Sequence, residues 1–163
     1  MDWIKKKKIL WIAHRQMLLD QAAESFQKFA YTEVITHVSS FCFRIVSGAS
    51  NHDRTSDIRP EDNLLIVSKD SIGRNLDRVD KWLKGEDEVY LIVDEAHHAT
   101  AKTYRKIIDH VKSKVPNLKI IGLTATPFRT AEEEQGLLAR IFTDGIKNGQ
   151  MVHGDVGIAY QIG

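Results

Sequence analysis

Two adjacent carboxylates and an imidazole follow a short apolar run in the middle of the chain. The run is Tyr90–Val93, and Asp94, Glu95 and His97 come directly after it. Such a run is typical of a buried strand, and open parallel sheets bind ligands at the carboxyl ends of their strands. There, one carboxylate can hold Mg²⁺ beside a phosphate chain, usually through a water, and a second can deprotonate an attacking water. Asp94 and Glu95 suit these two roles, although acidic residues that merely begin a helix would look the same.

A second apolar run ends in hydroxyl groups. It covers Lys119–Leu123, and Thr124 and Thr126 follow before Pro127 ends the extended segment. If this run ends beside the first one, either threonine can hydrogen-bond the acidic residues or His97. Taken alone, the threonines would indicate only β-propensity and a turn.

These residues must be positioned by alternating strands and helices. Strands are predicted at Ile9–Ala13, Leu64–Val67, Val89–Val93 and Ile120–Leu123. Apolar residues at helical spacing predict helices around Leu18 to Phe29, Ile72 to Leu83, Tyr104 to Val111 and Ala131 to Phe142. This order predicts an α/β domain of three layers, a doubly wound and mainly parallel sheet with helices on both faces. One or two short strands are expected within Thr32–Val46, and a long polar surface loop over Ser47–Asn63.

Length and composition exclude several classes of protein. The chain has 163 residues, enough for one domain with a full core. Its net charge of +1 gives no general attraction to polyanions, so a nucleic acid would have to meet a local patch. A single cysteine excludes an internal disulfide framework and suits the cytoplasm. No apolar stretch is long enough to span a bilayer, so no membrane association is expected.

The motifs resemble those of a known family. The quoted elements are the Asp94–His97 box, Thr124–Pro127, and Ile9–Arg15 followed by Leu18–Ala22, which looks like motif Ia. In this order, each at the end of a predicted strand, they are similar to the first RecA-like domain of superfamily 2 (DEAD/DEAH-box) helicases. The narrower resemblance is to the branch that contains the helicase subunits of type III restriction enzymes.

The resemblance implies a role for each matching residue at an ATP site. Asp94 would support Mg²⁺, and Glu95 would be the catalytic base for ATP hydrolysis. His97 would link the nucleotide site to the nucleic-acid site, and Thr124 and Thr126 would relay the same coupling. The implied cofactors are ATP and Mg²⁺.

The resemblance also implies contacts to a nucleic-acid backbone. His14 and Arg15 lie where motif Ia meets a helix start, and a cation there suits a phosphate of the bound strand. Ser68 and Lys69 lie where the family has its next strand-contacting motif. That motif usually carries a threonine and a glutamine, whereas this chain has Ser68 and Asp70, so the hydroxyl is kept and the amide is not. A solvent-facing helix residue is the plainer interpretation of Arg15.

The family's Gly-Lys-Ser/Thr phosphate loop is not found in this sequence. The family places that loop before motif Ia, and a second RecA-like domain after the first. Residues 1–163 are therefore expected to be a partial RecA-like domain, from motif Ia to just past motif III, of a larger protein. Losing a strand from inside the sheet would leave open strand edges, which favour self-association.

Two functions remain open from the sequence. The first is part of an ATP-dependent helicase or translocase, inactive as this chain alone, acting on DNA rather than RNA because of the restriction-type branch. The second is a nucleic-acid-binding module that has lost ATP chemistry. An unrelated α/β hydrolase using Asp94 and His97 ranks last, because no serine or cysteine elbow is present.

Overall fold

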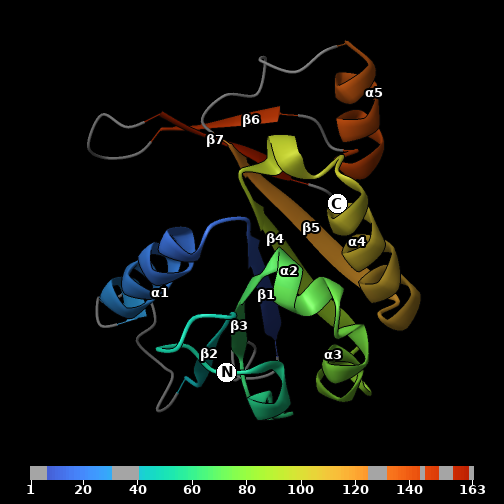
Figure 1. The fold of residues 1–163 in the computed structure, drawn as a ribbon. Helices are drawn as coiled ribbons and strands as arrows, with labels where there is room; N and C mark the ends of the chain where they lie inside the picture. The colour runs from blue at the N-terminus through green and yellow to red at the C-terminus, as the bar shows by residue number, and fades with distance from the viewer. Residues whose placement is uncertain (1–6, 31–40, 125–131, 144–145, 151–155, 162–163) are drawn as a thin grey trace.

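A computed structural model describes residues 7–30, 41–124, 132–143, 146–150 and 156–161. They form a seven-stranded sheet in the order β2-β3-β1-β4-β5-β7-β6 (Figure 1). The strands are β1 (Lys8–Ala13), β2 (Phe43–Val46), β3 (Leu64–Ser68), β4 (Glu88–Asp94), β5 (Asn117–Thr124), β6 (Ile146–Gln150) and β7 (Val156–Gln161). The first five are parallel to one another, whereas β7 pairs antiparallel with both β5 and β6. The expected α/β fold with a mainly parallel sheet is confirmed.

The helices lie on both faces of this sheet. They are α1 (Gln16–Ala30), α2 (Lys69–Gly73), α3 (Leu76–Leu83), α4 (Lys102–Lys114) and α5 (Glu132–Ile141), with short 3₁₀ helices η3 (Thr55–Asp57) and η4 (Ala96–His98). In Figure 1, α1 stands apart from α2, α3 and α4, which lie together across the sheet from it. This is the three-layer arrangement that right-handed crossovers between parallel strands produce. No helix among the residues described is long and apolar enough to cross a membrane.

Side chains alternate between two cores because successive residues of a strand point to opposite faces. In β1, Leu10 and Ile12 belong to the larger core, which also holds the buried faces of α2, α3 and α4. Ala13 and the half-buried Trp11 belong to the smaller core beneath α1, where the Trp11 ring meets Phe26 edge-on with 5.4 Å between ring centroids. Near-continuous apolar runs in the sequence thus reflect burial on both faces.

The structure differs from the sequence-based expectation in three places. The helix expected from Ile72 to Leu83 is two helices, because Arg74 and Asn75 separate α2 from α3. The expected short strands reduce to β2 at Phe43–Val46, and residues 31–40 lie outside those described. The Gly-rich C-terminal segment, where no strand was predicted, contributes the antiparallel strands β6 and β7. Since β7 pairs with Ile121–Thr124, the outer edge of β5 is covered there.

Candidate functional site

The two acidic residues lie where β4 ends. Because β1, β4 and β5 are parallel neighbours, their carboxyl ends meet at one edge of the sheet. Asp94 is the last residue of β4, and Glu95 connects it to η4. Both side chains are half-buried. The structure thus places the carboxylates at the edge where open parallel sheets bind ligands.

The backbone of Glu95 is held in an unfavourable conformation. Its φ of 52° and ψ of 57° lie in the left-handed region. Among the residues described, it is the only non-glycine residue with a positive φ. This conformation costs a non-glycine residue about 1–3 kcal/mol and is concentrated at functional sites. It turns the chain sharply out of β4, so that the amide of His98 donates to the Glu95 carbonyl at 2.9 Å and closes η4.

Opposing effects of the surroundings act on the pKa of the Asp94 carboxyl. Burial is the main one and raises the pKa of Asp94 above its usual range, and the nearby charge of Glu95 raises it further. The backbone N–H of Glu95 donates to Asp94 Oδ1 at 2.9 Å, and this bond, with the Trp11 indole, lowers the same pKa. Asp94 is therefore a half-buried carboxyl for which the effect of burial outweighs the hydrogen bonds that favour its ionised form. Such a group gains strongly from a cation or a hydrogen-bond donor placed beside it.

Glu95 carries the clearest unsatisfied group of the site. Its Oε2 atom is buried and has no hydrogen-bond partner in the part of the chain that the structure describes. The Nε2 atom of His98 lies 3.8 Å from this oxygen, beyond hydrogen-bonding distance. A buried acceptor without a donor costs free energy, so the position favours a ligand or water that donates to it.

His97 and Thr124 are joined as the sequence predicted. The Nδ1 atom of His97 lies 3.2 Å from Oγ1 of Thr124, the last residue of β5. Thr124 is 7% exposed, so this contact is shielded from water. The expected proximity of the two strand ends is therefore realised for this threonine, whereas Thr126 lies outside the described residues.

Two further histidines extend this contact across the sheet edge. The ring of His98 lies 4.1 Å from that of His97 and 5.2 Å from that of His14, measured between centroids. Three imidazoles thus connect the end of β1 with the end of β5, passing over η4. The role of His98 was not predicted, because a contact between residues 14 and 98 leaves no local pattern in the sequence.

Close packing fixes η4 on β5. A Cβ built on Gly122 would lie 2.7 Å from the Ala96 Cβ and 2.7 Å from the ring of Phe142. Only glycine admits so close an approach, and it brings Asp94, Glu95 and His97 against the neighbouring strand. In the sequence, Gly122 is only one residue of an apolar run, so this role was not predicted.

A buried tyrosine lies close to the carboxylates. Tyr104 of α4 is fully buried, and its hydroxyl has no hydrogen-bond partner among the described residues. Burial is the main cause that raises the pKa of Tyr104, with added repulsion from Asp94, Glu95 and Asp70. It therefore stays protonated and is a donor near the acidic residues. The apolar spacing predicted Tyr104 on a helix but gave no sign of its proximity to the site.

The predicted nucleic-acid residues divide into two groups. His14 and Arg15 follow β1 and are exposed, as a strand-contacting pair requires. Ser68 instead caps α2, since its Oγ accepts from the Ser71 amide at 3.2 Å and donates to the Ser71 hydroxyl at 2.9 Å. The ammonium of Lys69 lies 3.2 Å from Asp70. The structure therefore leaves His14 and Arg15 outward-facing and gives Ser68 and Lys69 partners within the chain.

No group of three or more His, Cys, Asp and Glu side chains suited to a metal ion occurs in the described ranges. A cation that keeps most of its waters needs only one or two carboxylates. The desolvated Asp94 and the unpaired oxygen of Glu95 are oxygen donors of that kind. The donor set therefore fits Mg²⁺ and does not resemble a zinc site.

The fold and this site define an α/β domain of the RecA-like helicase type. The helicase domain of Hef from Pyrococcus furiosus is similar in structure, with a TM-score of 0.57 and 20% identity over 82% of this chain. The model of the family described as type III restriction enzyme, res subunit, matches residues 1–129. The chain belongs to this family.

Two other similar proteins have related descriptions. The Saccharomyces cerevisiae protein named "Putative ATP-dependent helicase IRC3" is 30% identical over 121 residues, which are 73% of this chain and 15% of that protein. A structure of the type ISP restriction-modification enzyme LlaGI with a DNA substrate mimic has a TM-score of 0.49 and 20% identity, and covers 74% of this chain and 11% of that one. The chain spans 26% of the Hef helicase structure. It thus spans a minor part of each of these relatives.

Proposed function

We propose that this chain is part of an ATP-dependent helicase or translocase that hydrolyses ATP with Mg²⁺ and acts on DNA. The observation that carries the proposal is the pair of carboxylates at the end of β4, one desolvated and one with an unpaired buried oxygen. Membership of a restriction-enzyme helicase family supports it. The family also makes DNA a better choice than RNA as the partner.

In this proposal each carboxylate has one task. Asp94 would hold Mg²⁺, usually through a water, and the charge of the ion would favour the ionised form of this carboxyl, whose pKa is raised mainly by burial. The ion, when bound, neutralises charge on the phosphate oxygens of ATP. Glu95 orients the attacking water, which donates to its unpaired oxygen, and takes the proton. The strained backbone of Glu95 keeps this carboxylate at the strand end.

The coupling between the two sites is assigned to the contacts of η4. His97 contacts Thr124, and the ring of His98 lies between those of His97 and His14. A change at Glu95 would therefore reach His14, next to the exposed Arg15, through packed side chains. Thr126 is proposed to act with Thr124 in the same relay, as the family resemblance implies.

The parent protein is proposed to be larger than this chain. Residues 1–163 would be a partial RecA-like domain, completed by a Gly-Lys-Ser/Thr phosphate loop and a second RecA-like domain. Incomplete burial on one face of the sheet supports a missing segment. The half-buried side chains there are Tyr90 and Ile92 of β4 and Ile121 and Leu123 of β5. Self-association of this chain through open strand edges, and a cytoplasmic location, belong to the same proposal.

ATPase measurements test the motor function. The rate is measured with and without DNA, for this chain and for a version extended through a phosphate loop and the second domain, each with a Glu95→Gln control. We expect only the long version to hydrolyse ATP, and Glu95→Gln to abolish the activity. A silent long version would contradict the motor function.

A nucleic-acid-binding module without ATP chemistry is the second candidate. It is favoured by a hollow beside His14 that lies at the ends of β1, β2 and β3, away from the end of β5. Salt-sensitive DNA binding by this chain, with no ATPase in the long version, would establish it.

A further inference from the structure

A hollow of about 520 Å³ opens at the carboxyl ends of β1, β2 and β3. It is lined by polar side chains from three elements and the loops that follow them. These include His14 after β1, Ser47 and Arg54 after β2, and Asp70, Ser71 and Arg74 from α2 onward. Charged groups and hydroxyls of this kind suit a small anion and not an apolar molecule.

Two arginines dominate the charge of this hollow. Arg54 and Arg74 are exposed, and neither guanidinium has an ion pair in the part of the chain that the structure describes. The carboxylate in the lining, Asp70, lies 3.2 Å from the ammonium of Lys69. Lys69 thus offsets the charge of Asp70, and the two arginines remain to attract an anion.

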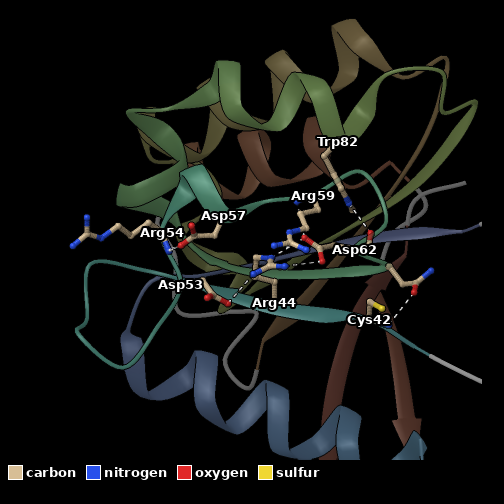
Figure 2. A network of polar contacts seen from close by, with 9 residues as sticks. Cys42, Arg44, Asp53, Arg54, Asp57, Arg59, Asp62 and Trp82 are labelled. Atoms are coloured by element: carbon tan, nitrogen blue, oxygen red, sulfur yellow. Dashed lines mark hydrogen bonds and ion pairs between the residues drawn. The ribbon is translucent and has the colours of Figure 1, made fainter.

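The loop that carries Arg54 is held by a buried ion-pair network. Arg44 of β2 donates to Asp62 at 2.8 Å through Nε and lies 3.3 Å from Asp53 (Figure 2). Asp62 also accepts from the backbone N–H of Arg59 at 2.8 Å, and its carbonyl accepts from the Trp82 indole at 2.7 Å. Both ends of the segment from Asp53 to Asp62 are therefore fixed to the sheet and to α3.

A second network fixes the same loop to α1. His52 is nearly inaccessible, with 3% of its side chain exposed. Its Nε2 lies 2.8 Å from Asp20 of α1, and its Nδ1 lies 2.6 Å from Ser47. The backbone N–H of Arg54 in turn donates to Asp57 at 2.8 Å. The backbone at Arg54 is thus anchored on each side, while its side chain extends away from the network (Figure 2).

We propose that Arg54 and Arg74 bind one phosphate group of a nucleic-acid strand in this hollow. Guanidinium groups bind phosphate oxygens through paired, charge-assisted hydrogen bonds, and an anchored loop loses little entropy on binding. The hollow adjoins His14, so the phosphate bound there lies next to the one expected at His14 and Arg15. The proposal rests on the nucleic-acid part of the proposed function and adds a contact from the polar loop.

Binding of a fluorescent single-stranded oligonucleotide to this chain tests the assignment. Fluorescence anisotropy gives the dissociation constant between low and physiological salt for the wild type, Arg54→Gln, Arg74→Gln and the double variant. Each single change should weaken binding about tenfold, as expected for one lost charge-assisted contact. The double variant should also lower the slope of log affinity against log salt by about 0.7, the value for one phosphate of a single strand.

Arg78→Gln is the matched control. Arg78 is also an exposed arginine, but it lies on α3 outside the hollow, 3.9 Å from Asp77. Its loss should leave both affinity and salt slope unchanged. If the double variant binds like the wild type, the pocket assignment is overturned while nucleic-acid binding stands. If the wild type binds no oligonucleotide, the nucleic-acid part of the proposed function fails as well.

A free phosphate ion is the alternative ligand of the hollow, because it presents the same oxygens as a phosphate of a nucleic-acid strand. Inorganic phosphate and pyrophosphate are titrated while amide NMR signals of Gly48 and Ser71, both in the lining, are followed. Shifts at millimolar phosphate that disappear in the double variant, together with oligonucleotide binding, support the proposal. Phosphate binding without oligonucleotide binding would assign the hollow to a small anion and overturn the strand assignment.

Discussion

The imidazole of His14 lies 5.2 Å from that of His98, although 83 residues separate them in the chain. His14 follows β1 and His98 ends η4, directly after Asp94 and Glu95. The contact places the exposed residue that follows β1 against the short helix that follows the carboxylates. A nucleic acid bound near His14 and a nucleotide bound near Asp94 would therefore touch adjoining side chains.

Two substitutions of Glu95 separate the effect of its backbone strain from the effect of its carboxylate charge. Glu95→Ala and Glu95→Gly both remove the carboxylate, but only glycine relieves the left-handed conformation at φ 52°. We expect the glycine variant to exceed the alanine variant in free energy of unfolding by about 1 kcal/mol, measured by urea denaturation. Equal stabilities would show that η4 rearranges when the side chain is removed.

The raised pKa of Asp94 predicts that replacing this carboxyl by a neutral amide stabilises the protein in a pH-dependent way. Burial makes the folded protein hold this proton more tightly than the unfolded chain, whose reference pKa is 3.8. Ionisation therefore costs stability, and the cost develops as the pH rises from the unfolded-state value through the raised folded-state value. Asp94→Asn should melt above the wild type at pH 7.

The same comparison at low pH is the control for Asp94→Asn. At pH 3 the wild-type carboxyl is largely protonated in both states, so the two melting temperatures should converge. A difference that persists unchanged at pH 3, or a lower melting temperature at pH 7, would contradict a cost of ionisation at this site.

The contact between His97 and Thr124 should be measurable as an interaction energy. Thr124→Val removes the hydroxyl and keeps the shape, and His97→Ala removes the partner at 3.2 Å. A double-mutant cycle of unfolding free energies should give a coupling of about 1 kcal/mol. Additive effects of the two changes would mean that the contact contributes no stability.

Gly122→Ala should destabilise the domain by about 1–3 kcal/mol, because the added methyl group would overlap Ala96 and Phe142. Gly136→Ala is the matched control, since a Cβ there meets nothing within 4 Å. Gly136 lies in α5, where alanine should add up to about 1 kcal/mol through helix propensity. Thermal unfolding of both variants measures the contrast, and a neutral Gly122→Ala would refute the tight contact.

Asp62→Asn should cost about 3 kcal/mol in unfolding free energy. Asp62 is 4% exposed and accepts two bonds from the Arg44 guanidinium, so its neutralisation leaves this largely buried cation with only the half-exposed Asp53, at 3.3 Å, as an anionic partner. Asp77→Asn, at an exposed pair 3.9 Å apart, should stay within about 0.5 kcal/mol of the wild type. If both variants unfold like the wild type, the Arg44 network does not hold the loop.

Much of this arrangement could be predicted from the sequence, because it depends on local patterns. Runs of β-branched residues located β1, β3, β4 and β5, and apolar spacing located the main helices. Asp94 and Glu95 were recognised because their types and their position after a strand are themselves sequence features. The break between α2 and α3 at Arg74 and Asn75 was missed, since the apolar spacing continues across it.

Other features were decided by tertiary structure alone. Three features join residues far apart in the chain: the contact of the His14 and His98 rings, the tight contact of Gly122 with Ala96, and the hollow shared by Arg54 and Arg74. Their geometry depends on strand order, register and a loop held by ion pairs. Sequence by itself determined which groups stand at the strand ends, because hydrophobic periodicity is local. Only the folded sheet decided which of those groups meet, because parallel pairing aligns strand ends irrespective of their separation in sequence.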